Sequence, residues 1–167
     1  TQPYVEIRKE IHRHPELKYE EVRTAELVEK HLTKLGYSVQ TGIGKTGVVA
    51  LLDTGNPGPT IAFRADIDAL PINELNEFSH KSTSQGLMHA CGHDGHSTML
   101  LGAAKHLSEH GSFDGTVYFI FQPAEEHGKG AWSMIEDGLF DHYQIDSIYG
   151  LHNLPGLAEG QFAIRSH

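Results

Sequence analysis

An apolar run, GTVYFIFQ at residues 115–122, places the strongest limit on what this chain can fold into. A run of this kind is typical of a strand that is buried on both faces, which requires a layer of other elements on each side. The 167 residues, 38% of them hydrophobic, are enough for one domain with a core and too few to demand two. The run therefore predicts a single α/β domain.

Helical and strand patterns surround this run in a definite order. Residues 20–35 repeat apolar positions at helical spacing and are followed by Gly36, which predicts a helix with a clear end. The other expected elements are helices at 3–14, 95–110 and 129–140, strands at 38–40, 47–54, 60–68 and 147–153, and a hairpin turn in GNPGP at 55–59. The order α-α-β-β-β-α-β-α-β predicts a mixed β-sheet covered by helices.

Composition excludes several classes of protein. A formal net charge of −9 argues against a nucleic-acid partner, because phosphate recognition needs a concentrated positive face. The single cysteine rules out an internal disulfide framework and favours a reducing compartment. The first twenty residues are too charged for a secretory signal, and no apolar run approaches the 18 residues that a membrane span needs. We therefore expect a cytoplasmic protein with no membrane partner.

Polar residues follow three of the expected strands. RAD at 64–66 follows IAF, PAEE at 123–126 follows VYFIFQ, and LHN at 151–153 follows SIYG. Ligands of open α/β sheets bind at the carboxyl ends of the strands. These three segments are therefore candidates for one functional site.

The segment MHACGHDGH at 88–96 contains three histidines and the only cysteine. Cys91 and His93 could close on one ion or on two adjacent ions, because the glycine between them lets the backbone bend. His89 and His96 lie four and three residues from His93, which would place either pair on one face of a helix, but two glycines argue against a continuous helix here. Two alternatives remain: solvated loop histidines around an inert thiol, and a cysteine nucleophile with a histidine base and an oxyanion hole.

Glu125 and Glu126 offer two consecutive carboxylates just after an apolar strand. In hydrolytic metal sites one carboxylate can bind the ion while another takes a proton from water, and these two tasks need separate groups. Neighbouring residues of a strand point to opposite faces, so both can serve only if the chain turns after Pro123. The alternative is a solvated acidic loop.

Asp66, Asp68 and His152 lie at the same strand ends. Either aspartate could hold a metal ligand or a base in position, or could cap a turn or pair with Arg64. His152 could be a ligand or a structural histidine. Eight other histidines show no such convergence and are expected at the surface or at helix caps: His12, His14, His31, His80, His106, His110, His142 and His167.

Six segments together carry a resemblance to a known family. They are IRKEIHRHPEL, GIGKTGVVA, FRADIDALPI, MHACGHDGH, FQPAEE and GLHNLPG, in this order. The chain resembles N-acyl-amino-acid amidohydrolases of the hippurate hydrolase, auxin-conjugate hydrolase and N-acetyldiaminopimelate deacetylase type, a branch of the aminoacylase and carboxypeptidase metallopeptidase superfamily. The resemblance implies a zinc-exopeptidase-like catalytic domain that cleaves the amide bond of an N-acyl amino acid.

The resemblance also implies a dinuclear metal centre with Cys91, His93, Glu126 and His152 as ligands and Cys91 as a bridge. Glu125 would be the general base that activates water and later returns the proton to the leaving amine. Asp66 matches the aspartate that supports the catalytic groups, with Asp68 as the second choice. Other branches carry a metal-binding histidine where this chain has Arg64, a loss for which His93 would compensate.

Thiolate and imidazole ligands favour zinc for the two divalent ions, while manganese, cobalt or nickel also suit carboxylate-rich dinuclear sites. Such a pair of ions polarises an amide carbonyl and lowers the pKa of water. Members of the family insert a lid and dimerisation domain after a segment like GQFAIR and then complete the catalytic domain with one more metal-binding histidine. We therefore expect residues 1–167 to be the N-terminal portion of the catalytic domain, with homo-oligomers formed through the lid. The alternative is a noncatalytic metal-binding module or an inactive fragment.

Overall fold

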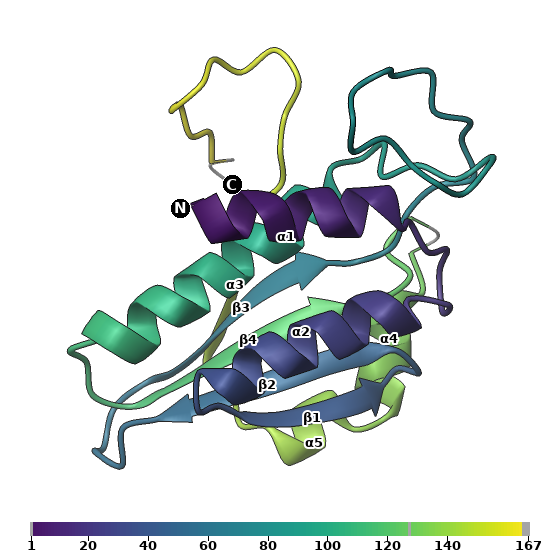
Figure 1. Ribbon diagram of the computed structural model, residues 1–167. Helices are drawn as coiled ribbons and strands as arrows, with labels where there is room; N and C mark the ends of the chain where they lie inside the picture. Colours follow the sequence, from purple (N-terminus) through teal and green to yellow (C-terminus); the bar gives the residue numbers. More distant parts are fainter. Residues whose placement is uncertain (1, 127, 165–167) are drawn as a thin grey trace.

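A computed structural model describes residues 2–126 and 128–164 (Figure 1). The elements follow the expected order, with one short helix added. In chain order they are α1 (Gln2–Arg13), α2 (Val22–Lys34), β1 (Ser38–Ile43), β2 (Gly47–Asp53), β3 (Thr60–Asp66), α3 (His93–His110), β4 (Thr116–Gln122), α4 (Gly130–Glu136), α5 (Leu139–His142) and β5 (Ser147–Gly150). The predicted class, a mixed sheet covered by helices, is confirmed.

The apolar strand β4 lies at the centre of a five-stranded sheet with the order β1-β2-β4-β3-β5. It pairs antiparallel with β2 and parallel with β3, and β5 pairs parallel with β3. The hairpin expected at residues 55–59 is therefore wrong, because β4 separates the two strands that this segment joins. The segment instead packs on the start of β4, where the Thr116 N–H donates to the Pro59 carbonyl at 3.1 Å.

Side chains of β4 alternate between two cores on opposite faces of the sheet. Val117, Phe119 and Phe121 pack in one core with apolar residues of α2 and α3. Ile120 packs in the other core with Met134 of α4 and with α5. Burial on both faces is what the apolar run predicts, since a strand with one solvent face would alternate with polar residues.

The helix expected over residues 129–140 is two short helices. Gly138 lies between α4 and α5 in the left-handed conformation, with φ of 87°. A glycine adopts this conformation at little cost, so the chain changes direction here and Leu139 still reaches the second core. None of the helices within residues 2–126 and 128–164 has both the length and the apolar character needed to cross a bilayer.

The parallel strands bring three segments to one edge of the sheet. Asp66 of β3 pairs in register with Gln122 of β4, and Arg64 pairs with Gly150 of β5. The residues that follow these strands therefore emerge side by side.

Candidate metal centre

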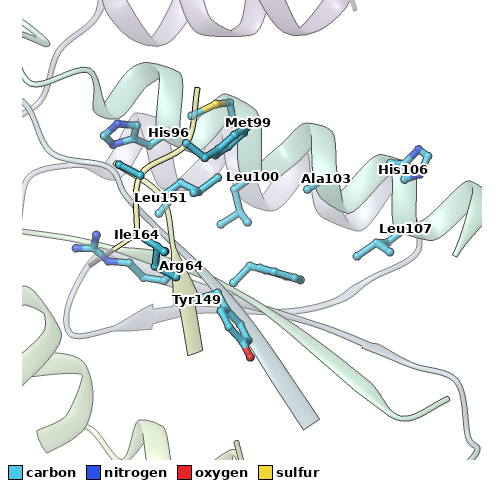
Figure 2. A pocket seen from close by; sticks show the side chains of 15 residues that line it. Arg64, His96, Met99, Leu100, Ala103, His106, Leu107, Tyr149, Leu151 and Ile164 are labelled. Atoms are coloured by element: carbon cyan, nitrogen blue, oxygen red, sulfur yellow. The ribbon is translucent and has the colours of Figure 1, made fainter. Parts of the chain in front are cut away.

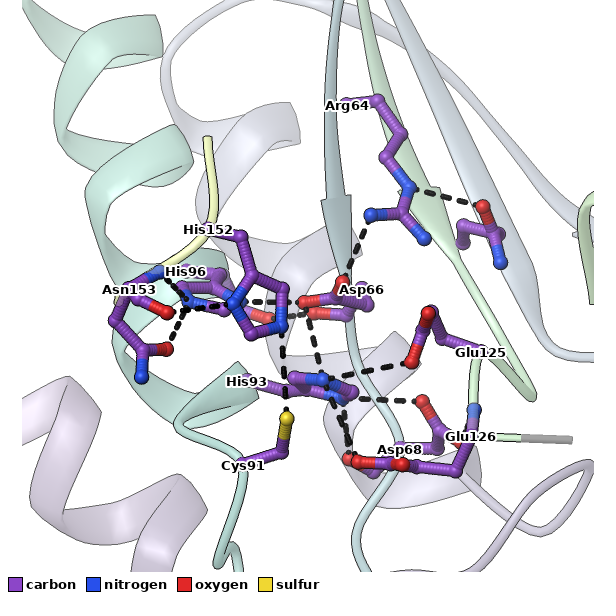
Figure 3. Close-up of polar contacts among 12 residues, drawn as sticks. Arg64, Asp66, Asp68, Cys91, His93, His96, Glu125, Glu126, His152 and Asn153 are labelled. Carbon is purple, nitrogen blue, oxygen red and sulfur yellow. Dashed lines mark hydrogen bonds and ion pairs between the residues drawn. The ribbon is translucent and has the colours of Figure 1, made fainter. Parts of the chain in front are cut away.

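Four segments meet at the carboxyl ends of β3, β4 and β5 (Figure 3). They are Asp66–Asp68 at the end of β3, Cys91–His96 at the start of α3, Glu125–Glu126 after β4, and His152–Asn153 after β5. All six residues named from the sequence as catalytic groups or ligands lie in these segments. Of the histidines expected at the surface, His12 is buried, which corrects that expectation, and His167 lies outside the described residues.

Helix α3 begins at His93, and this start decides which histidines share a face. Gly92 is the N-cap in the left-handed conformation, with φ of 91°, so it lies outside the helix and does not interrupt it. His93 and His96 are both buried and their ring centroids lie 5.5 Å apart, whereas His89 precedes the helix. The sequence argued against a continuous helix here because of the two glycines. The structure corrects this, since His93 and His96 lie in the same helix.

His93 is held by Asp68. Its Nδ1 lies 2.8 Å from the Asp68 carbonyl oxygen and 3.1 Å from Oδ1. A carbonyl only accepts, so Nδ1 carries the proton and donates, which leaves Nε2 to face Asp66, Glu125 and Glu126 at 3.6, 3.8 and 3.7 Å. Burial alone lowers the pKa of His93, but the bond to Asp68 and the surrounding carboxylates raise it. The surroundings therefore favour a positive charge at this point.

The turn after β4 directs two neighbouring carboxylates into the site. Ala124 has φ of 48°, and the Gly128 N–H donates to the Glu125 carbonyl at 2.7 Å. The Glu126 N–H donates to Asp68 Oδ2 at 3.1 Å, which ties the turn to the segment after β3. The chain thus leaves the strand alternation at Pro123, as two cooperating carboxylates require.

Asp66 and His96 form the other side of the site. The His96 Nδ1 donates to Asp66 Oδ1 at 2.6 Å, and the Asn153 backbone N–H donates to His96 Nε2 at 3.1 Å. Burial raises the pKa of Asp66, but His96, His93 and Arg64 outweigh it and lower the pKa to about 2. Asp66 is therefore a carboxylate whose partners are all cationic or proton donors.

His152 lies on an exposed segment and reaches the site through its contacts. Its ring centroid is 4.5 Å from that of His96, and its Nε2 is 3.5 Å from Cys91 Sγ. Gly92 permits this approach, because a Cβ there would lie 2.6 Å from Asn153 Oδ1. His96 and Asn153 were not among the ligands or catalytic groups expected from the sequence; the spacing of three residues between His93 and His96 and the position of LHN after a strand were the available signals.

The surroundings of Cys91 do not suit a nucleophile. Burial, followed by the charges of Glu126 and other carboxylates, raises the pKa of its thiol to about 12. A cysteine nucleophile needs a lowered pKa. A thiolate at this position instead calls for a cation beside it.

The donor atoms fit divalent cations. Two groups have ligand atoms within 4.8 Å of one another, namely Asp66, His93, His96 and His152, and Cys91, His93 and Glu126. His93 Nε2 and Glu126 Oε1 are buried, 3.7 Å apart, and without a hydrogen-bond partner among the described residues. Two ligands of one zinc ion, each at about 2.0–2.2 Å, lie roughly 3.3–3.6 Å apart in tetrahedral geometry. Arg64 belongs to neither group, since it donates to Asp66 at 2.7 Å and to Gln122 at 2.9 Å.

An apolar cavity of about 600 Å³ lies beside this centre, between α3 and the strands β3 and β5 (Figure 2). Met99, Leu100, Tyr149 and Ile164 contribute to its wall, and His96 lies at the end nearest the centre. Among the described residues no carboxylate lines it, and His96 is the one member of the two donor groups that does.

Comparisons with known proteins find relatives that match most of this chain. The hippurate hydrolase of Campylobacter jejuni is 47% identical over 162 residues, which are 97% of this chain and 42% of that protein. IAA-amino acid hydrolase ILR1-like 5 of Arabidopsis thaliana is 51% identical over 158 residues, 93% of this chain and 36% of that protein. A crystal structure from Bacillus subtilis, described as a dinuclear metal binding peptidase from the M20 family, is 40% identical, covers 93% of this chain and 44% of its own, and has a TM-score of 0.88.

The chain thus spans less than half the length of each of these proteins. Residues 62–167, which include all four segments of the centre, match a family described as peptidase family M20/M25/M40. The chain belongs to the M20/M25/M40 family of peptidases.

Proposed function

We propose that this chain is part of a metal-dependent amidohydrolase that cleaves N-acyl amino acids to a carboxylate and an amino acid. The observation that carries the proposal is a pair of buried atoms, His93 Nε2 and Glu126 Oε1, to which no other described residue offers a hydrogen bond, with the Glu125 carboxylate beside them. Names of relatives, a hippurate hydrolase and an IAA-amino acid hydrolase, support an acylated amino acid as the substrate class.

Four residues would hold two divalent ions: Cys91, His93, Glu126 and His152. When bound, the ions would polarise the amide carbonyl and lower the pKa of an attacking water. A soft thiolate with imidazoles favours zinc, and manganese, cobalt or nickel are the alternatives. His96 lies among the same donors but has both ring nitrogens engaged, by Asp66 and by Asn153, so we assign it to holding Asp66 and the segment of His152.

Glu125 is the proposed general base. Its side chain is 37% exposed, against 18% for Glu126, so Glu125 is the more accessible of the two to a water or substrate that enters from solvent. It would take a proton from water and return it to the leaving amine, which is a role that needs a carboxylate free of the ions. Asp66 would fix the histidines, and Asp68 orients His93 through Nδ1.

We propose that residues 1–167 are the N-terminal portion of a catalytic domain, since the relatives are more than twice as long. A lid domain and the remaining part of the catalytic domain would close the substrate site, and homo-oligomers would form through the lid. A reducing compartment suits a ligand thiolate, so we place the enzyme in the cytoplasm.

The test is hydrolysis of acetyl-, benzoyl- and indoleacetyl-amino acids by the complete polypeptide that contains this chain. Activity should vanish with a chelator and return with zinc or manganese. Magnesium is the control, because it prefers oxygen ligands and should not restore activity.

Two other results would reject the proposal. Stoichiometric binding of metal without turnover of any acyl amino acid would favour a noncatalytic metal-binding module. Inactivation by iodoacetamide combined with indifference to chelators would favour a cysteine nucleophile.

A further inference from the structure

Glu21 is a fully buried carboxylate far from the metal donors in sequence, and the proposed reaction does not use it. It occupies the N-cap position of α2, yet its side chain makes no cap hydrogen bond to that helix. Its Oε1 instead accepts the backbone N–H of Ala124 at 2.9 Å, and its Oε2 accepts the hydroxyl of Thr46. A carboxylate is costly to bury, so its two partners are the reason that it can remain there.

Ala124 is the residue before the proposed base, and its backbone is strained. Its φ of 48° lies in the left-handed region, which a residue with a Cβ seldom occupies. Such residues persist where the surroundings hold them, and they are frequent in active sites. Glu21 supplies that hold through the Ala124 N–H.

The non-glycine residues with a left-handed backbone lie around Glu21. Three non-glycine residues with positive φ occur among the described residues: Tyr19, Lys45 and Ala124. Tyr19 and Lys45 contact each other, with the Lys45 Nζ 4.4 Å from the centre of the Tyr19 ring, and they flank Glu21 and Thr46 in sequence. The loop before α2, the turn between β1 and β2 and the turn after β4 therefore converge on this carboxylate.

The turn of Glu125 is fixed at its other end as well. The Gly130 N–H donates to the Ala124 carbonyl at 3.1 Å, and a Cβ at Gly130 would lie 1.5 Å from the Pro123 carbonyl oxygen. Glu126 has its own anchor in Asp68. Glu21 thus binds the turn at Ala124, the residue that directly precedes Glu125.

We propose that Glu21 is a positioning residue for the Glu125 carboxylate, acting through the left-handed backbone of Ala124. This inference rests on the proposed function, in which Glu125 is the base. Loss of Glu21 should let Ala124 relax towards an ordinary conformation and displace Glu125, whereas Glu126 keeps its bond to Asp68. The defect should therefore appear in kcat, with KM and metal content retained.

The experiment compares four variants in the complete metal-loaded polypeptide. Glu21→Ala should lower kcat on the order of 100-fold, which is the effect of a misplacement of about 1 Å. Glu21→Gln should keep kcat near that of the wild type, because its amide oxygen can still accept the Ala124 N–H. The control Thr46→Val removes only the other bond, so it should lower the melting temperature while kcat is kept.

The decisive variant is Glu21→Ala combined with Ala124→Gly. Glycine adopts positive φ without the steric cost, so it should recover about tenfold of the lost kcat. The proposal is overturned if Glu21→Ala keeps its kcat, if glycine gives no recovery, or if Thr46→Val loses kcat equally. If Glu21→Ala does not fold, Glu21→Asp replaces it: the shorter side chain withdraws the acceptor and must give the same loss and the same recovery.

Amide hydrogen exchange separates this inference from the proposed function. The Ala124 and Gly130 amides should exchange faster in Glu21→Ala than in the wild type, whether or not the protein hydrolyses amides. A wild type without hydrolysis rejects the proposed function alone. Unchanged exchange at both amides rejects the role of Glu21 in holding the turn.

Discussion

Replacement of His12 by alanine should destabilise the protein strongly, although the residue lies outside the metal centre. His12, near the end of α1, is buried with its Nδ1 2.9 Å from Asp94 and its Nε2 3.1 Å from Glu74. The two carboxylates are themselves buried, with side chains 1% and 3% exposed. Removal of the imidazole leaves two buried negative charges that have lost their common partner.

The remaining contacts set the size of the effect. Breaking a buried ion pair by removing one partner costs about 3–5 kcal/mol. Arg8 still lies 3.2 Å from Asp94, and the Ser82 N–H still donates to Glu74 at 2.6 Å. These contacts place the expected loss near the lower limit, about 3 kcal/mol, out of a total of roughly 5–15 kcal/mol for a folded domain.

The loss of stability caused by His12→Ala should decrease as the pH rises. The hydrogen bond to Asp94 raises the pKa of His12 against the opposing effect of burial, and Glu74 raises it further. A histidine with a raised folded-state pKa contributes most below its unfolded pKa of about 6.5, and this contribution disappears as pH rises through the folded-state value. The difference between wild type and His12→Ala should therefore be largest near pH 6 and smaller at pH 9.

The assay is urea unfolding followed by circular dichroism, with a chelator present, across this pH range. His14→Ala is the matched control, because its half-buried ring lies 3.5 Å from Glu10 in a pair that should contribute less than about 1 kcal/mol. A loss for His12→Ala that equals the control, or that increases with pH, would refute the reasoning.

Three further predictions concern the centre and its surroundings. Glu125→Gln should retain metal and lose turnover by about 10²–10⁴-fold, while Glu77→Gln at an exposed site stays active; unchanged turnover would remove Glu125 as the base. Cys91→Ala should bind less metal, measured by elemental analysis, and a fully loaded variant would exclude the thiol as a ligand. Burial lowers the pKa of His89 to about 4, so wild-type stability falls as pH drops below about 6.5. His89→Phe should therefore be more stable than the wild type at pH 5, by roughly 1–2 kcal/mol, and equal or lower stability in urea unfolding would contradict this.

The order of elements and the class of fold follow from local pattern. The apolar run of β4 indicates a strand buried on both faces, and the apolar spacing in residues 22–34 indicates α2. Local pattern does not predict which strands pair with one another in the sheet. A turn signal at residues 55–59 is equally compatible with a hairpin and with a crossing over β4, and the structure has the crossing.

Positions after the strands indicated one candidate site, but local pattern left the roles of its residues open, and the family resemblance supplied them. Glu125 and Glu126 follow β4, so the direction of the parallel strands brings them to this edge, whereas Cys91 and His93 reach it at the N-terminus of α3. His96 was considered as a neighbour of His93 on one helix face but left out of the expected ligands, because only the folded N-terminus of α3 shows that Gly92 is a cap rather than an interruption.

Local sequence thus determined which segments are helices and strands and which side chains carry reactive groups. Tertiary structure alone decided the environment of each group, because burial and partnership depend on residues distant in the chain. His12 reads as an ordinary histidine at a helix end, yet Asp94, 82 positions later, makes it part of a buried ion pair. Glu21 lies inside the helix expected at 20–35, yet Ala124, 103 positions later, makes it a support for the turn of Glu125.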